Sequence, residues 1–345
     1  MTRLHHLLIF RFSSLGDVTM TVPVIKLLLQ QHPELNVVMV SNSFMEPLFK
    51  DIERLQFYAA DLKGRHKGIK GLYRLYLDLK ISFLFDAIAD LHDVLRTKLL
   101  RSFFLLSGKP IAVINKGRVE KKKLTRQKDK VLKPLKSTFE RYADVFRFLN
   151  LPVILSAGEA IKKASSIPMP LQKLKQQRAL IIGIAPFAQY AEKTYPPEKM
   201  KEVIRLLLQH HEAIIFLFGS KNDAVIFQQW ENEFERVESL AGKMNFEKEL
   251  QYIAALDVMI SMDSANMHLA SLYNVPVVSI WGATHPYAGF YGWAQLPANA
   301  IQIDLYCRPC SVFGNKPGYR GDLLCLHSIA PLTIYNKVME NISLG

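Results

Sequence analysis

The sequence is poor in cysteine and has no long apolar run. Three of its 345 residues are cysteine, a small odd number that excludes a disulfide framework and fits a reducing compartment. No segment reaches the ~18 uninterrupted apolar residues that a membrane-spanning helix needs. The apolar residues 7–10 are too few for a signal peptide, end at Arg11 and precede no small-residue cleavage site. We therefore expect a cytoplasmic protein whose only membrane association would be peripheral, at the inner membrane.

Acidic residues are scarce relative to basic ones. Lys and Arg total 44 against 31 Asp and Glu, which gives a formal net charge of +13. The excess gathers in residues 116–136, where ten basic residues accompany only Glu120 and Asp129. Such a stretch attracts polyanions, whether nucleic acid, anionic lipid head groups or a phosphorylated substrate. A solvated basic loop without a partner would have the same composition.

The length suits two domains better than one, since a single core rarely grows past ~250–300 residues. Apolar runs typical of strands alternate with segments of helical spacing. Strands are predicted at residues 7–12, 37–41, 86–91, 111–114, 179–184, 213–218, 258–261 and 275–280. Helices are predicted at residues 22–31, 69–85, 94–106, 138–149, 197–210, 246–256 and 267–273. This alternation predicts parallel sheets covered on both faces.

Pro152 and residues 165–170 have the composition of a linker. We therefore predict a first doubly wound α/β domain over residues 1–165, a second over 175–330 and a C-terminal helix over 331–345. Ligands of such sheets bind beyond the carboxyl ends of the strands. The chemistry is expected in the loops that follow the strands, facing a cleft between the domains.

The chain lacks the G-x-G-x-x-G dinucleotide fingerprint after its first predicted strand. In its place Ser13, Ser14, Gly16 and Asp17 lie where the strand ends and the first helix begins. Small residues there let the backbone approach a ligand, and the start of the helix offers N–H groups. Asp17 could act on that ligand or simply cap the helix.

A similar strand-to-helix segment begins at Asp263. Ser264 and Ala265 could present N–H groups to a diphosphate, and Asp263 could bind sugar hydroxyls. An ordinary capped helix, with His268 partly buried, explains the same residues. Lys193 lies just before another helix, where a lysine could neutralise a leaving phosphate or be an ordinary surface residue.

All three cysteines lie near the end of the chain. Cys307, Cys310, Cys325 and His327 could form a tetrahedral zinc set. Their spacing is not that of a standard zinc finger, and buried or loop thiols are the favoured interpretation. We therefore assign no metal to the protein.

Taken together, the motifs resemble glycosyltransferase family nine, the ADP-heptose:lipopolysaccharide heptosyltransferases. The similarity runs from residue 8 to about residue 286 and is most specific in residues 240–286. The segments that carry it are residues 11–18 with Pro23, Lys193 with Tyr195 and Pro196, residues 218–220 with Asp223, residues 240–243, Asp263 and Ser264 with residues 267–270, and residues 276–286.

The resemblance implies a GT-B fold, in which two Rossmann-like domains face a cleft. It implies an inverting transfer of a heptose or related sugar from ADP-heptose to a lipopolysaccharide core acceptor, without a cofactor. Asp17 would be the general base and Lys193 the residue that neutralises the leaving phosphate. The implied donor-binding residues are Gln189, Lys193, Gly219, Ser220, Lys221, Met244, Asp263, Ser264, Ala265 and His268. The implied acceptor-binding residues are Ser13, Ser14, Gly16, Lys121, Lys122 and Lys123.

The chemistry agrees with these roles. A sugar hydroxyl is a poor nucleophile, and a positioned carboxylate can take its proton during attack. A lysine and helix N-terminal N–H groups can stabilise a departing nucleoside diphosphate without a metal. The expected partners are a nucleotide-sugar, a phosphorylated lipid-linked oligosaccharide and an anionic membrane surface, to which the basic residues 116–136 would be attracted.

Some residues depart from the family pattern. Ala265 stands where the family usually has glycine, Ala188 and Gln189 stand where some members have hydroxyls, and Lys221 stands where some have an acid near the ribose. These differences leave open a GT-B transferase or epimerase that uses another nucleotide-sugar. A non-catalytic basic protein that binds nucleic acid or membrane is a second alternative. Residues 116–136 lack the interleaved aromatics of a nucleic-acid module, so no nucleic-acid partner is expected.

Overall fold

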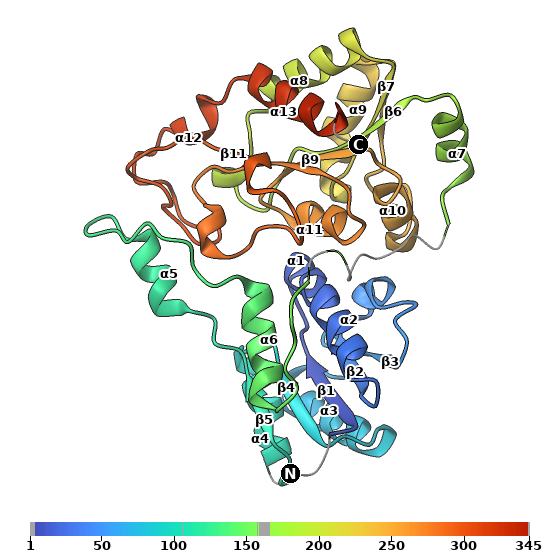
Figure 1. Cartoon of the computed structure of the whole chain (residues 1–345), viewed down its shortest axis with the longest axis vertical. Helices are drawn as coiled ribbons and strands as arrows, with labels where there is room; N and C mark the ends of the chain where they lie inside the picture. Colours follow the sequence, from blue (N-terminus) through green and yellow to red (C-terminus); the bar gives the residue numbers. More distant parts are fainter. Residues whose placement is uncertain (1–3, 106, 157, 159–165, 344–345) are drawn as a thin grey trace. The chain divides into compact units, whose positions relative to one another are not determined.

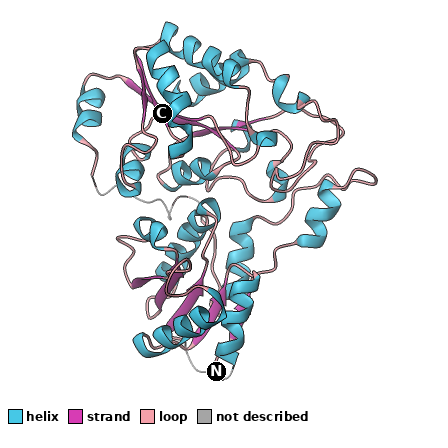
Figure 2. Cartoon of the chain, turned by 180° about the vertical axis from the view of Figure 1, so that it is seen from behind, coloured by secondary structure: helices cyan, strands magenta, loops and turns pink. Residues whose placement is uncertain are grey.

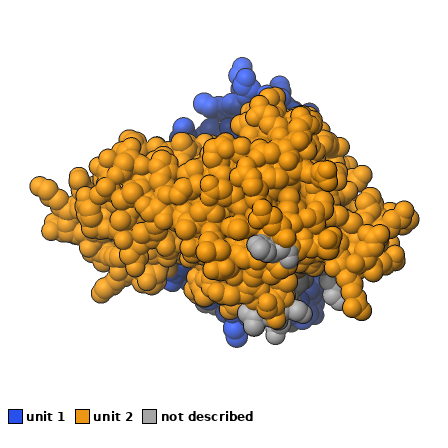
Figure 3. All heavy atoms as spheres, turned by 90° about the horizontal axis from the view of Figure 1, so that it is seen from above, with its two compact units in different colours: residues 1–116, 136–160 blue, residues 117–135, 161–345 orange. Residues whose placement is uncertain are grey.

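The computed structural model describes residues 4–105, 107–156, 158 and 166–343, and it divides into two compact units. Unit 1 contains residues 1–116 and 136–160, and unit 2 contains residues 117–135 and 161–345 (Figure 3). Each unit is built on one parallel sheet with helices packed against it (Figures 1 and 2). In the described part of the chain, no helix has both the length and the apolar character to cross a membrane.

Unit 1 has a five-stranded parallel sheet in the order β3-β2-β1-β4-β5. Its strands are β1 (His6–Phe10), β2 (Asn36–Ser41), β3 (Leu55–Ala59), β4 (Ala87–Asp90) and β5 (Ile111–Val113). Its helices are α1 (Leu15–Thr19), α2 (Thr21–Gln31), η1 (Ser43–Leu48), α3 (Gly68–Ser82), α4 (Leu95–Leu105) and α6 (Thr138–Phe148). Leu7, Leu8, Ile9 and Phe10 of β1 are fully buried, as expected for a central strand covered on both faces.

Unit 2 has a six-stranded parallel sheet in the order β11-β10-β9-β6-β7-β8. Its strands are β6 (Leu180–Ala185), β7 (Ala213–Leu217), β8 (Val237–Ser239), β9 (Val258–Met262), β10 (Val277–Ile280) and β11 (Ala300–Ile301). Its α-helices are α5 (Arg118–Thr125), α7 (Met169–Gln176), α8 (Pro197–His210), α9 (Ala224–Glu233), α10 (Phe246–Ile253), α11 (Ala265–Leu272), α12 (Leu324–His327) and α13 (Pro331–Ser343). Single 3-10 turns are η2 (Ala191–Lys193), η3 (Lys221–Asp223), η4 (Pro286–Ala288) and η5 (Pro297–Asn299).

Both sheets have the strand order of the Rossmann fold, which confirms the predicted doubly wound α/β class. Read from the first strand of each unit, the order is 3-2-1-4-5 in unit 1 and 3-2-1-4-5-6 in unit 2. The order reverses between β1 and β4 in unit 1 and between β6 and β9 in unit 2. Ligands of such sheets bind at these switch points, beyond the carboxyl ends of the strands.

The strands and helices predicted from the sequence are all present, with ends that differ by a few residues. Residue 106, the end of one predicted helix, lies outside the described residues. The prediction missed the strands β3, β8 and β11, because β3 is only partly buried and β8 and β11 have three and two residues. It also missed the helices α5, α7, α9 and α12. The linker prediction for residues 165–170 was wrong at its end, since α7 begins at Met169. Pro170 is compatible with helix here because it lies in the first turn, where its missing N–H has no intrahelical partner.

Residues 117–135, here named the basic arm, do not follow the predicted domain boundary. They lie between β5 and α6 of unit 1 in the sequence, and we expected them in the first domain, but the structure places them in unit 2. The Lys130 ammonium donates to the carbonyls of Cys307, at 2.6 Å, and Pro309, at 3.0 Å. The Leu135 N–H donates to the Tyr287 carbonyl at 2.9 Å. The chain therefore leaves unit 1 after Lys116 and returns to it at Lys136.

The long loop after β11 is fixed by a buried arginine, Arg308, whose side chain is 2% exposed. Its guanidinium donates to the carbonyls of Gly282, at 2.6 Å, and Thr284, at 2.9 Å. It also bonds the Ile303 carbonyl and the side chain of Gln302. One side chain thus joins the loop after β10 to the loop after β11, and burial lowers the pKa of Arg308.

Replacing Arg308 by methionine should destabilise unit 2, because several buried carbonyl groups would lose their donor. Hydrogen bonds to charged groups contribute about 1.5–3 kcal/mol each, so we expect the melting temperature to fall by roughly 5–10 °C. Differential scanning calorimetry measures this. The control is Arg320→Met, since Arg320 makes an exposed ion pair with Asp322 and exposed pairs contribute little. Equal melting temperatures for the two variants would contradict the role given to Arg308.

Candidate functional site

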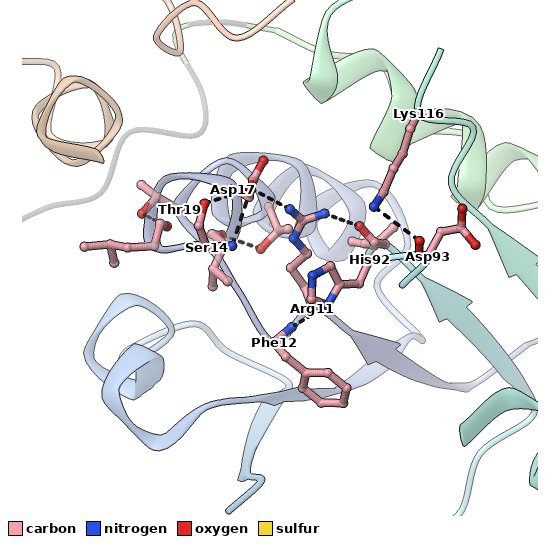
Figure 4. A network of polar contacts seen from close by, with 12 residues as sticks. Arg11, Phe12, Ser14, Asp17, Thr19, His92, Asp93 and Lys116 are labelled. Atoms are coloured by element: carbon pink, nitrogen blue, oxygen red, sulfur yellow. Dashed lines mark hydrogen bonds and ion pairs between the residues drawn. The ribbon is translucent and has the colours of Figure 1, made fainter. Parts of the chain in front are cut away.

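The switch point of unit 1 holds a cation–carboxylate pair (Figure 4). The Arg11 guanidinium lies 2.7 Å from Oδ2 of Asp17, and the Ser14 hydroxyl donates to the same oxygen at 2.8 Å. Arg11 is buried and also donates to the Leu91 carbonyl at 2.6 Å. The Asp17 side chain is 27% exposed. The loop after β1 therefore presents a fixed carboxylate to solvent, with its counter-charge held underneath.

The loop after β4 adds a histidine to this site. Oδ1 of Asp90 accepts the backbone N–H groups of His92, at 2.8 Å, and Asp93, at 2.9 Å, which turns the chain sharply after the strand. The Phe12 N–H points at Nδ1 of His92 at 3.4 Å. Burial and the nearby charges of Arg11 and Lys116 lower the pKa of His92 to about 3. The imidazole is therefore neutral at physiological pH.

Three further contacts hold the loop after β1 in place. The Tyr142 hydroxyl of α6 donates to the Asp17 carbonyl at 3.1 Å. Cζ of Arg11 lies over the Tyr142 ring, 5.9 Å from its centroid. The Ser41 hydroxyl donates to the Arg11 carbonyl at 2.6 Å. Asp17 thus lies on a loop fixed from three elements, which is the preorganisation that proton transfer requires.

The switch point of unit 2 holds a second cation–carboxylate pair. The Lys193 ammonium donates to the Asp263 carbonyl at 2.7 Å and lies 3.6 Å from Oδ2 of the same residue. The two side chains are 13% and 10% exposed. Lys193 ends η2, which follows β6, and Asp263 follows β9. The contact therefore joins the loops that end the two strands flanking the switch point.

The remaining candidate donor residues follow neighbouring strands of the same sheet. Ser264 is the N-cap of α11, and its hydroxyl lies 3.2 Å from the hydroxyl of Ser261. Ala265 begins α11, and His268 is buried on it. Because parallel strands end at one edge of a sheet, these groups lie on the same edge as Lys193.

The loops after β7 and β8 touch each other. Gly242 adopts φ +71°, and a Cβ on it would lie 3.0 Å from Cγ of Lys221. The Ser220 hydroxyl donates to Asp223 at 2.7 Å, which fixes the turn after Gly219. Gln189 is exposed in the loop after β6, and Met244 is half-buried just past Gly242. Among the described residues, no hydrogen bond or ion pair joins these residues to Lys193.

The basic residues predicted to bind an acceptor differ in exposure. The ammonium of Lys121 lies 4.1 Å from the centre of the Phe290 ring, and the residue is 8% exposed. Lys122 and Lys123 are exposed on the same helix, α5. Ser13 and Ser14 are exposed and Gly16 is buried, all in unit 1.

The cysteines form no metal site among the described residues. Cys307, Cys310 and Cys325 are buried and free, and the Cys310 thiol points at the Cys307 carbonyl at 3.1 Å. No group of three or more His, Cys, Asp or Glu side chains is arranged to hold a metal in the parts of the chain that are described.

Sequence reasoning missed residues that shape both sites. His92 follows a predicted strand, so its position at the end of β4 was a usable signal. Arg308 gave none, because an isolated arginine in a loop has no distinguishing pattern. Its hydrogen bonds to the Gly282 and Thr284 carbonyls join residues more than twenty positions apart.

Comparison with known proteins finds heptosyltransferases by sequence and proteins of the same fold by structure. A sequence model of glycosyltransferase family 9 (heptosyltransferase) matches residues 84–316. The lipooligosaccharide heptosyltransferase 2 of Campylobacter jejuni is 25% identical over 300 residues, which cover 86% of each chain.

Two solved structures share the fold over the whole chain. A glycosyl transferase family 9 protein from Veillonella parvula has a TM-score of 0.75 at 18% identity, covering 99% of this chain and 98% of that one. The E. coli heptosyltransferase WaaC with ADP has a TM-score of 0.67 at 18% identity, covering 97% and 99%. Both matches confirm the predicted GT-B type of fold.

Acid should destabilise unit 1 through His92. The unfolded chain binds a proton near the ordinary pKa of 6.5, whereas the folded chain does so only near 3. The contribution of neutral His92 is therefore complete above pH 6.5 and is lost as the pH falls from 6.5 towards 3. His92→Asn should make the pH dependence shallower by up to about 1.4 kcal/mol per pH unit in this window.

Urea unfolding between about pH 7 and 4.5 measures this effect, and the imidazole resonances of His92 should remain those of the neutral form down to about pH 5. Parallel pH profiles for the wild type and His92→Asn would contradict the prediction.

Proposed function

Because the chain belongs to glycosyltransferase family 9 (heptosyltransferase) and is a glycosyltransferase, we propose that it transfers a heptose from ADP-heptose to a lipopolysaccharide core acceptor, with inversion at the anomeric carbon. The proposal depends on the pair of polar sites at the two switch points, one with a partly exposed carboxylate and one with a largely buried lysine. These are the two groups that an inverting transfer needs, a base for the acceptor and a cation for the leaving group.

The donor is proposed to bind unit 2. WaaC, which shares the fold, was solved with ADP. Lys193 would neutralise the diphosphate, and the N–H groups at the start of α11 would bind the same oxygens. Gln189, Gly219, Ser220, Lys221, Met244 and His268 would complete the donor site. Asp263 would bind sugar hydroxyls, because a carboxylate accepts hydrogen bonds from them.

The acceptor is proposed to bind unit 1. Asp17 would take the proton of the attacking hydroxyl, and Ser13, Ser14 and Gly16 would contact the acceptor beside it. The relative from C. jejuni is a lipooligosaccharide heptosyltransferase, which supports a lipid-linked oligosaccharide as acceptor. The transfer of a sugar from a nucleoside diphosphate to a hydroxyl requires no redox group.

Asp17→Asn should reduce turnover by about 10²–10⁴-fold, the usual contribution of a general base. The amide keeps the size of the side chain but cannot accept the proton. Turnover is followed as ADP release from ADP-heptose with a heptose-deficient core acceptor, and ADP affinity should change little.

The matched control is Asp86→Asn. Asp86 precedes β4, at the edge of the sheet opposite to Asp17, where its Oδ2 accepts the N–H groups of His5 and His6, so this variant should retain most of the activity. Melting curves exclude unfolding caused by exposing the charge of Arg11. Normal turnover by Asp17→Asn would reduce Asp17 to a helix cap.

The exposed lysines of the basic arm are proposed to hold the protein at an anionic membrane or on acceptor phosphates. Lys122, Lys123 and Lys128 are exposed, and a lysine near an anionic surface contributes about 1 kcal/mol. Lys121 is less suited to this role, because its ammonium packs on Phe290. The chemical step would not involve the arm.

Changing Lys122, Lys123 and Lys128 together to Gln should weaken binding to phosphatidylglycerol vesicles roughly 100-fold at low salt and remove most of its salt dependence. Changing the exposed Lys50, Lys173 and Lys248 to Gln alters the net charge equally and serves as control. Vesicle sedimentation measures both. A raised KM for a soluble, lipid-free acceptor would instead assign the lysines to acceptor phosphates, and equal vesicle binding by all three proteins would exclude the membrane role.

A further inference from the structure

The side chain of Lys193 runs across a glycine of a distant loop. A Cβ built on Gly314 would lie 2.5 Å from Cγ, 2.8 Å from Cδ and 3.2 Å from Cε of Lys193. Three successive carbons of the lysine therefore lie against the Cα of Gly314. Real Cβ atoms do not approach carbon atoms this closely, so the path of the lysine towards Asp263 exists only because residue 314 has no side chain.

Gly314 is itself held in a defined position. It adopts φ +74°, a conformation that favours glycine. Its N–H donates to the buried Ser311 hydroxyl at 3.0 Å. The N–H groups of Cys310 and Ser311 both donate to the Ala283 carbonyl, at 2.8 and 3.2 Å. The glycine is thus linked to the segment after β10 through the Ser311 hydroxyl and the backbone hydrogen bonds to Ala283.

The same loop end is tied back to the turn that carries Lys193. The Ala283 N–H donates to the Glu192 carbonyl at 3.0 Å. A Cβ on Gly282 would lie 2.6 Å from that carbonyl, so the two segments are in close contact. Lys193 is therefore held at its backbone through Glu192 and along its side chain by Gly314.

The basic arm also contacts this loop. Lys130 donates to the carbonyls of Cys307 and Pro309, a few residues before Gly314. The Lys121 ammonium lies over Phe290, whose ring packs against Phe313 with centroids 5.6 Å apart. Phe313 is the neighbour of Gly314 in the chain, so the arm reaches the segment before Gly314 directly through Lys130 and indirectly through Phe290.

We propose that Gly314 is a positioning residue of the donor site, which holds the ammonium of Lys193 in place for the donor diphosphate through its missing side chain. This inference rests on the proposed role of Lys193 in binding and neutralising the diphosphate. Gly314 contacts only the stem of the lysine and takes no part in the chemistry.

The test compares two glycine substitutions of equal backbone cost. Gly314→Ala places a methyl group against the Lys193 stem. Gly321→Ala is the matched control, because Gly321 has nearly the same φ, +76°, in the same loop but no atom within 4 Å of its Cβ position. Gly314→Ala should lower kcat with ADP-heptose about 10-fold and weaken ADP binding in titration calorimetry, since a small misplacement of a charged group is costly. Gly321→Ala should leave both near wild type.

A double mutant separates positioning from general damage. In the Lys193→Ala background, Gly314→Ala should cause no further loss, because the group that it displaces is gone. A loss that persists there, or equal effects of Gly314→Ala and Gly321→Ala, would overturn the proposal. Wild-type kinetics of Lys193→Ala alone would show instead that the proposed function of the lysine is wrong.

Should Gly314→Ala fail to fold, Ser311→Ala gives the same test without a clash. It releases the Gly314 N–H from its 3.0 Å hydrogen bond. A smaller loss of kcat and ADP affinity is expected, again absent in the Lys193→Ala background. Unchanged kinetics of a folded Ser311→Ala protein would overturn the fixed-loop argument.

Discussion

The contact between Lys193 and Asp263 organises the switch point of unit 2. The lysine donates to the Asp263 carbonyl at 2.7 Å and thereby joins the loops after β6 and β9 across the point where the strand order reverses. A positive charge at this point is useful only if it is fixed, because a flexible ammonium would lose conformational entropy when it bound an anion. The short turn η2, the glycine at 314 and the carbonyl of Asp263 together restrict it.

The two units share one architecture, but the cation–carboxylate pairs at their switch points differ in burial. In unit 1 the cation, Arg11, is buried and the carboxylate, Asp17, is partly exposed. In unit 2 both Lys193 and Asp263 are largely sequestered. The first arrangement suits a group that must accept a proton from a bound alcohol, and the second suits a charge whose effect grows as water is excluded. Neutral His92 adds no charge beside Arg11.

The basic arm shows how composition and structure can give different accounts of the same residues. The composition of residues 116–136 indicated a surface that binds polyanions, and the exposed lysines of the basic arm remain suited to such binding. Two of its lysines serve another purpose, since Lys121 packs on Phe290 and Lys130 bonds the carbonyls of Cys307 and Pro309. Charge counted along a sequence cannot distinguish an ammonium group that faces water from one that is held by the protein.

The sequence by itself determined the doubly wound α/β class, the long strands and helices, the two strand-to-helix segments at Asp17 and Asp263, and the family. These follow from local periodicity and from residue order, both of which can be read directly from the sequence. Only the tertiary structure decided that the basic arm belongs to unit 2, that His92 joins the loop of Asp17, and that Gly314 lies under Lys193. Each of these depends on contacts between residues far apart in the sequence, where the distance between side chains is set by packing and leaves no periodic signal.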